Sequence, residues 1–174
     1  YNKDGNCVFT GSSLGAAIDM QYDENGMLQK MQSQGWQSDW LRDSSGLEIH
    51  RQLTGGVSVQ TERDQLGRVV RRSIGAYNVE QSRTRYEWGK DNKLLKMLNE
   101  IAKAKTDFTY DTFDNLISAS YNENGQTETV YRMPDKIGNL FKTKERSDRK
   151  YGKGGQLQQD EKYNYYYDAE GNLL

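Results

Sequence analysis

The sequence has little of several residue types on which many catalytic and structural sites depend. Cys7 is its only cysteine, so an intrachain disulfide and a zinc site built from cysteines are both excluded. His50 is its only histidine, and a serine–histidine–acid or cysteine–histidine mechanism would have to use that residue alone. We interpret His50 as a polar residue at the end of a strand and Cys7 as a small packed side chain. We therefore expect no catalytic residue, no metal site and no cofactor.

Large aliphatic side chains are also scarce. Leu, Ile, Val and Phe together make up 31 of the 174 residues, below the roughly 20% at which disorder becomes a concern. Disorder, however, goes with a large net charge and few aromatic residues. Here 24 Lys and Arg face 25 Asp and Glu, and the chain carries 12 Tyr and 3 Trp. These numbers favour a thin, tyrosine-rich architecture over a large apolar core.

Several partner classes lack support in the sequence. No run approaches the ~20 apolar residues of a membrane helix, and the first thirty residues lack the pattern of a signal peptide. The balanced charge gives no global electrostatic argument for nucleic acid or for an anionic membrane. Because residue 1 is Tyr1 and not Met, we interpret the chain as a piece of a longer protein.

What the sequence does contain is a repeated motif, Tyr/Arg-Asp-x-x-Gly-x-Leu. Its first three glycines, at positions 26, 46 and 67, are 20 to 21 residues apart, and the spacing shortens downstream. Such a period is typical of a repeat architecture. The turn and repeat positions that we assign are Tyr22, Asp23, Gly26, Asp43, Gly46, Asp64, Gly67, Tyr110, Asp111, Gly125, Pro134, Asp135, Gly138, Asp148, Tyr151, Gly155, Tyr167, Asp168 and Gly171.

Each part of the motif has a physical reason. Glycine adopts the positive φ that a tight turn requires, and an aspartate at the start of the turn accepts a hydrogen bond from an amide two residues on. Short alternating runs such as 57–61 and 108–110 are typical of strands. A lone hairpin is marginal in water, so the units must pair edge to edge. We predict an all-β fold: one continuous array of antiparallel hairpins over residues 1–174, forming part of a curved, spiralling sheet.

One segment also fits a helix. Between Lys93 and Lys105, apolar residues recur at roughly helical spacing. The alternative is two strands with a turn near residues 100–103, and the repeat that continues on both sides favours the strands.

The ordered motifs of the last third of the chain resemble the YD repeats of the Rhs (rearrangement hot spot) family. They are Pro134-Asp-x-x-Gly-Asn-Leu140, then Ser147-Asp-Arg-x-Tyr-Gly-x-Gly-Gly-x-Leu157, then Tyr167-Asp-x-x-Gly-Asn-Leu173. The repeat alone is shared with wall-associated proteins, Tc toxin C subunits and teneurins. The ordered trio is similar to that of Rhs-type polymorphic toxins, and the resemblance covers nearly the whole chain, more faintly in its first 20 residues.

The resemblance implies a structural role. In this family the hairpins form a hollow shell that encloses a C-terminal toxin until delivery, and the chain would be part of the wall without being an enzyme. Its partners would be the remaining repeats and the toxin of the same polypeptide, with the secretion machinery, in a secreted or surface-delivered protein. We expect no nucleic-acid partner and no membrane span, and we expect self-association through exposed edge strands.

Several groups of residues also fit other functions. Repeats with glycine and aromatics also build carbohydrate- or cell-wall-binding modules, in which Trp36 and Trp40 would stack on sugars. The repeated aspartates suggest calcium ligands, but one aspartate per turn favours turn capping. The basic stretch 142–153 suggests a nucleic-acid patch, yet a solvated connector crosslinked by Asp148 fits as well. No carboxylate pair stands out as a glycosidase site.

Overall fold

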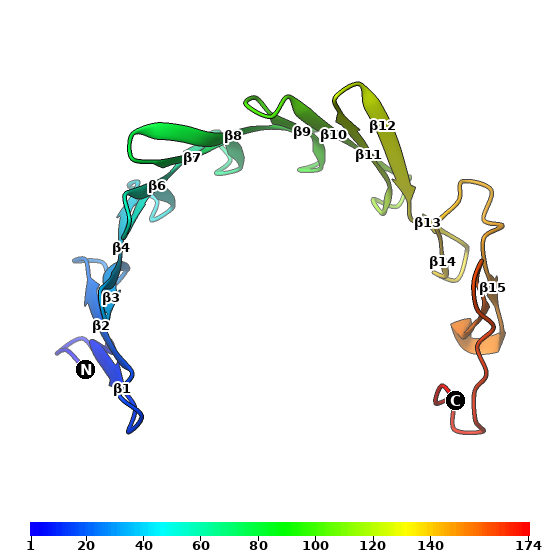
Figure 1. Ribbon diagram of the computed structural model, residues 1–174, viewed down its shortest axis with the longest axis horizontal. Helices are drawn as coiled ribbons and strands as arrows, with labels where there is room; N and C mark the ends of the chain where they lie inside the picture. The colour runs from blue at the N-terminus through cyan, green and yellow to red at the C-terminus, as the bar shows by residue number, and fades with distance from the viewer. The chain divides into compact units, whose positions relative to one another are not determined.

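The computed structural model describes residues 1–174, and its regular elements are antiparallel strands joined by turns, with a single 3-10 turn (Figure 1). The strands are β1 (Phe9–Gly11), β2 (Ala17–Tyr22), β3 (Leu28–Ser33), β4 (Trp36–Arg42), β5 (Glu48–Leu53), β6 (Val57–Arg63), β7 (Val69–Ala76), β8 (Val79–Trp88), β9 (Leu94–Asn99), β10 (Ala104–Tyr110), β11 (Leu116–Glu123), β12 (Gln126–Tyr131), β13 (Met133–Pro134), β14 (Leu140–Phe141), β15 (Lys150–Tyr151) and β16 (Leu157–Gln159). The only helical element is a 3-10 turn, η1 (Lys153–Gly155). No helix has the length and apolar character needed to cross a membrane. The expected all-β fold is confirmed.

The strands follow one another in chain order. Strands β1 to β12 form a twelve-stranded sheet in which each strand pairs with the next, and β13–β14 and β15–β16 form two separate two-stranded pairs. The chain divides into two compact units, one made of Tyr1–Trp88 with Met97–Lys103 and the other of Gly89–Lys96 with Ala104–Leu174. Within each unit the contacts lie chiefly between strands that are neighbours in sequence.

Neither unit has a conventional hydrophobic core. The buried apolar side chains are Val59, Ala119 and Phe141, and buried polar side chains are as numerous: Ser38, Thr61 and Ser118. The small number of buried apolar side chains agrees with the low aliphatic content of the sequence. Hydrogen bonds between strands and within turns must therefore carry much of the stability that apolar burial supplies in ordinary domains.

The segment that also fits a helix is a hairpin. Residues 94–99 form β9 and residues 104–110 form β10, with a turn over residues 100–103. At the start of this turn, the Asn99 side chain accepts hydrogen bonds from the amides of Ile101 and Ala102, at 3.1 and 2.9 Å. The strand prediction is confirmed, because the local turn chemistry and the pairing of neighbouring strands outweigh the helical spacing of a few leucines.

Two kinds of turn alternate along the sheet. Tight connections such as Gln34-Gly35 and Tyr77-Asn78, whose residues all have positive φ, join β3 to β4 and β7 to β8. The longer aspartate turns join β2 to β3, β4 to β5, β6 to β7 and β10 to β11. Since alternate connections of an antiparallel sheet lie at the same end of the strands, the aspartate turns of each unit form a row along one end.

Candidate functional site: the row of aspartate turns

The aspartate turn is a closed hydrogen-bonded loop. In the turn that begins at Asp23, the Asp23 Oδ1 accepts hydrogen bonds from the amides of Asn25 and Met27, both at 2.9 Å. The Asp23 amide donates to the Met27 carbonyl, and the Gly26 amide donates to the Asp23 carbonyl. Gly26 has φ +75°, a conformation that favours glycine. The side-chain pattern recurs in the turns that begin at Asn2, Asp43, Asp64, Asp111, Asp135 and Asp168.

In four turns the second carboxylate oxygen is also occupied. Asp64 Oδ2 accepts a hydrogen bond from Arg68 Nε at 2.7 Å. Asp111, Asp135 and Asp168 each accept one from the side-chain amide of the asparagine four residues on, at 2.8 to 3.0 Å. The Gly-Asn-Leu part of the motif thus places an asparagine that completes the cap. These bonds, from Arg68 to Asp64, from Asn115 to Asp111 and from Asn172 to Asp168, hold the pKa of each carboxyl below its ordinary value.

Most of the glycines assigned from the sequence occupy the position of positive φ in these turns. They are Gly26, Gly46, Gly67, Gly138, Gly155 and Gly171. In the Asp111 turn that position is taken by Asp114, at φ +69°. The turn after Tyr151 begins with Gly152 in place of aspartate.

Two assigned positions have a different environment from the motif. Gly125 and Asn124 form a two-residue hairpin turn between β11 and β12, so Tyr121 to Gly125 is not a copy of the aspartate turn. Its Asn-Gly pair is typical of tight hairpins. Asp148 does not cap a turn of its own. It accepts hydrogen bonds from the amides of Lys142 and Thr143 and from Arg149 Nε, and its side chain is 2% exposed.

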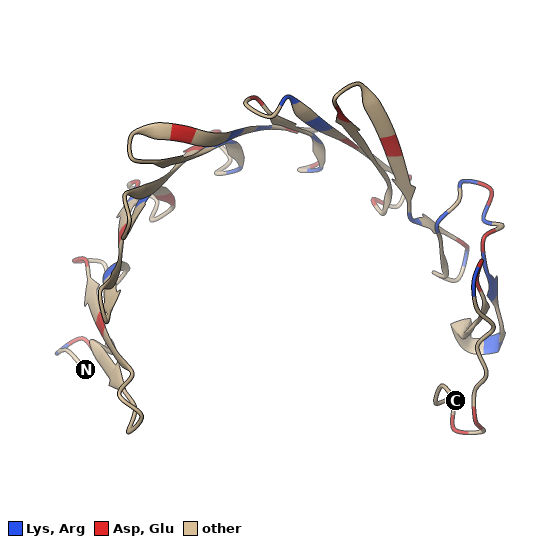
Figure 2. Ribbon diagram, viewed as in Figure 1, with Lys and Arg blue, Asp and Glu red and all other residues tan.

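Asp148 crosslinks part of the basic stretch 142–153, because it pairs with the Arg149 side chain and accepts the Lys142 amide. Burial raises its pKa, but the hydrogen bonds from Arg149 and Lys142 outweigh burial and hold the pKa below its ordinary value. Asp148 thereby ties the two ends of the 142–149 connector together. Figure 2 shows the basic and acidic residues of the chain interspersed along it.

Neighbouring turns are joined by a hydrogen bond that the motif does not state. In the first unit, the side chain just before each turn donates to a backbone carbonyl just after the preceding turn. Tyr22 Oη donates to the Cys7 carbonyl at 2.8 Å, and Trp88 Nε1 donates to the Val69 carbonyl at 2.7 Å. Two arginines make the same connection, from Arg42 to Leu28 at 3.2 Å and from Arg63 to Glu48 at 3.5 Å. We call this hydrogen bond the fastener.

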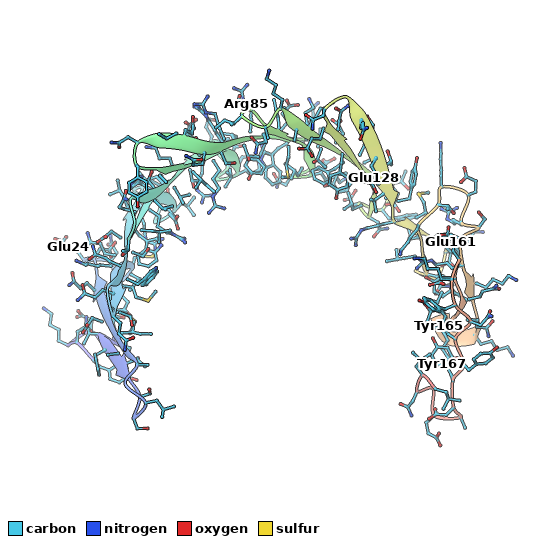
Figure 3. All side chains as sticks on the ribbon, in the orientation of Figure 1. Glu24, Arg85, Glu128, Glu161, Tyr165 and Tyr167 are labelled. Carbon is cyan, nitrogen blue, oxygen red and sulfur yellow. The ribbon has the colours of Figure 1, made fainter.

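The second unit uses the same connection with tyrosine alone. Tyr110 Oη donates to the Leu94 carbonyl at 2.9 Å, and Tyr151 Oη donates to the Leu140 carbonyl. Tyr167, labelled in Figure 3, donates to the Leu157 carbonyl at 2.9 Å. In both units the acceptor lies two residues beyond the positive-φ residue of the preceding turn. Tyrosine, arginine and tryptophan are interchangeable here because each carries a polar hydrogen at the end of a long, flat side chain.

A second contact runs along the row of turns. In most joints the residue after the turn glycine rests against the glycine of the next turn. A Cβ on Gly46 would lie 3.0 Å from Met27 Cε, and one on Gly67 would lie 3.2 Å from Leu47 Cδ1. Where Asp114 replaces glycine, the residue in the equivalent place is Lys93, and the two form an ion pair. A polar pair thus replaces the packing of an apolar side chain on bare backbone.

The tryptophans assigned to sugar stacking differ in exposure. Trp36 is 41% exposed at the start of β4. Trp40 lies further along the same strand, half-buried, and the Arg51 guanidinium lies 5.4 Å from its ring centroid. A cation over the ring occupies the surface on which a sugar would stack. His50 and Cys7 are half-buried, in β5 and before β1.

Reasoning from the sequence identified the turns but missed the fastener. The signal was present, since the residue before each aspartate is tyrosine or arginine in the sharp copies. The donor role becomes visible only when the carbonyl of the preceding turn is placed beside the ring or guanidinium.

The lowered pKa values give a pH prediction. Asp64, Asp111 and Asp168 ionise more readily in the folded chain than in the unfolded chain, so they contribute stability at pH values above about 4, the ordinary aspartate value. That stability is lost as the pH falls through the depressed folded values. When the urea concentration at the unfolding midpoint is measured from pH 7 to pH 2, it should decrease once the pH drops below about 4. The decrease should be smaller in D168N. An unchanged pH profile in D168N would contradict the capping role of that carboxylate.

The fastener predicts the effect of removing one oxygen atom. Y110F deletes the donor to the Leu94 carbonyl and keeps the ring, so the free energy of unfolding should fall by about 1 kcal/mol. The matched control is Y121F, because Tyr121 is 48% exposed and its hydroxyl makes no hydrogen bond in the structure. Urea unfolding checks both. Equal stability losses in the two variants would remove the fastener as a source of stability.

Comparison with known proteins gives similarities of fold only. No protein-family model and no curated protein matches the chain. Among solved structures, the Tc holotoxin pore of Photorhabdus luminescens, with a mutation in TccC3, is 11% identical with a TM-score of 0.61 over 99% of this chain. TcdB2-TccC3 without its hypervariable C-terminal region is 12% identical with a TM-score of 0.69 over 97%, and TcdB2-TccC3 is 12% identical with 0.63 over 72%. The chain spans only 11%, 9% and 8% of those chains. It has the β-fold of one segment of these toxin chains.

Proposed function

We propose that the chain is a structural repeat region of an Rhs-type toxin, where it forms part of the wall of a hollow β-shell. The shell encloses a C-terminal toxin of the same polypeptide until delivery. The observation that carries this proposal is a joint between turns that recurs along the array. Each joint combines the aspartate cap of a turn with a fastener and a glycine contact to the preceding turn, and it extends the array by one unit. Such a construction suits a wall that grows by repetition. The similarity to segments of Tc toxin chains supports the same role.

The proposal assigns no enzyme activity to these residues. Six aspartates of the repeat have an oxygen engaged by two amides of their own turns, which suits a carboxylate that holds backbone in place. The partners would be the adjoining repeats, the enclosed toxin and the secretion machinery, in a protein delivered outside the cell that makes it. Strand β12 pairs only with β11, so its other edge is open to the adjoining part of such a polypeptide or to a second copy.

Protection of the enclosed toxin tests the shell. The longer polypeptide in which this chain is proposed to lie would be treated with trypsin, with cleavage of its C-terminal region followed over time. We expect protection in the unmodified protein and rapid cleavage in G46V, because Gly46 has φ +78° and a Cβ there would lie 3.0 Å from Met27. S45V is the matched control, since the equivalent positions of other turns carry Leu66, Phe113 and Ile137. A C-terminal region cleaved equally fast in all three proteins would overturn the proposal.

A carbohydrate-binding module is the second candidate, and the exposed ring of Trp36 is the observation in its favour. Trp36 lines a cavity together with polar residues, among them Gln34, Gln37 and Asp19. This candidate predicts that the chain is retained on immobilised peptidoglycan and that W36A abolishes retention, whereas W88A, which lies in a fastener, does not. The shell proposal predicts no retention in any of the three proteins. A pull-down with quantified bound fraction separates the two.

A further inference from the structure

One joint between aspartate turns lacks both connecting contacts. Between the Asp111 and Asp135 turns, the residue in the fastener position is Pro134, which has no side-chain donor. No side chain donates to the Leu116 carbonyl, two residues beyond Asp114, where the pattern places the acceptor. A Cβ on Gly138 would meet nothing within 4 Å, so no side chain of the Asp111 turn rests against this glycine. The row of turns is therefore interrupted within the second unit.

A groove occupies this interruption. It has a volume of about 770 Å³, against about 410 Å³ for the equivalent space between the Asp23 and Asp43 turns, which Met27 and Arg42 line. Leu116, Phe113, Pro134 and Leu140 line the groove between the Asp111 and Asp135 turns. Phe113 is 84% exposed and Leu140 is 48% exposed. The groove thus combines an apolar lining with a backbone carbonyl that has no side-chain donor.

The charge that the groove offers to a partner is positive. Arg132, Lys136 and Arg146 line it, all three are exposed, and none forms an ion pair. Arg146 Nε donates to the Pro134 carbonyl at 2.9 Å, which fixes that side chain beside the groove. The two carboxylates in the lining, Asp111 and Asp135, accept hydrogen bonds from their own turns with both oxygens. The three basic side chains are therefore not neutralised by the two aspartates of the lining, whose oxygens all accept hydrogen bonds within their own turns.

We propose that this groove binds a peptide segment of a partner polypeptide that presents a tyrosine beside carboxylates. The tyrosine hydroxyl donates to the Leu116 carbonyl, as the fastener tyrosines do to theirs. The ring packs against Phe113 and Pro134, and the flanking carboxylates bind Arg132 and Arg146. An arginine or a tryptophan has the geometry of a fastener donor, but the positive lining repels an arginine. The same lining attracts a segment whose residues beside the donor are acidic.

Three matched peptides test the groove. The complete 174-residue chain, labelled with ¹⁵N, would be titrated with the capped peptide Gly-Glu-Tyr-Asp-Gly, with its Phe analogue, and with a Gly-Lys-Tyr-Lys-Gly analogue. We expect the first to shift the amide resonances of residues 111–116 and 132–140 and to leave those of the Asp43 turn unchanged. The Phe analogue should bind about fivefold more weakly, as the loss of one hydrogen bond requires. The lysine analogue should produce no shifts.

Variants of the chain distinguish binding in the groove from non-specific binding elsewhere on the chain. P134Y places a tyrosine before Asp135, as in the other turns, and should abolish binding by filling the groove. R132Q should weaken binding about tenfold, while R72Q, an exposed arginine of β7, should leave it unchanged. The proposal is overturned if the lysine analogue binds as well as the acidic peptide, if R72Q weakens binding as much as R132Q, or if no peptide shifts these resonances. Concentration-dependent shifts of the same resonances without peptide would assign the groove to a second copy and overturn it as well.

Discussion

The structure depends on one hydrogen-bonding arrangement, in which an aspartate side chain accepts the amides of its own turn. A sheet with so few buried apolar residues cannot rely on a core to fix where its strands reverse direction. The turn at Asp23 solves this locally, because four hydrogen bonds close within five residues and the glycine supplies the positive φ. Every other feature of the row of turns presupposes this geometry. The fastener finds its carbonyl only because the preceding turn places it.

Connections between turns then convert separate hairpins into an array. The fastener supplies a side-chain donor to a backbone carbonyl of the preceding turn, and the glycine contact lets the turns approach closely. Both connections link a turn only to the one before or after it. The stability of such an array is close to a sum of terms for each unit and each joint. The joint at Pro134 has neither connection, so it contributes less to the stability of the array than the other joints do.

The sequence was sufficient to predict the strands and the turns, because their chemistry is local. Gly26, Gly46 and Gly67 mark the positive-φ positions, and the aspartate three residues before each one marks the start of the turn. Gly125 is a turn glycine as assigned, but its turn is an Asn-Gly hairpin, which shares with an Asp-x-x-Gly turn a glycine and a nearby acidic or amide residue. The fastener and the groove could not be predicted. Both depend on which carbonyl lies beside which side chain on the next turn, and that is decided by pairing between strands 10 to 19 residues apart in sequence.

The tolerance of the fastener position has a consequence for how such chains diverge. Tyr22, Arg42 and Trp88 fill one role with three unrelated side chains, and Lys93 with Asp114 replaces an apolar contact on glycine. A repeat that accepts so many substitutions can keep its backbone geometry while its amino-acid sequence changes. An alignment that scores residue identity loses track of it long before the backbone changes. The chain accordingly has the fold of toxin segments, with TM-scores of 0.61 to 0.69, while only 11 to 12% of its residues are identical to theirs.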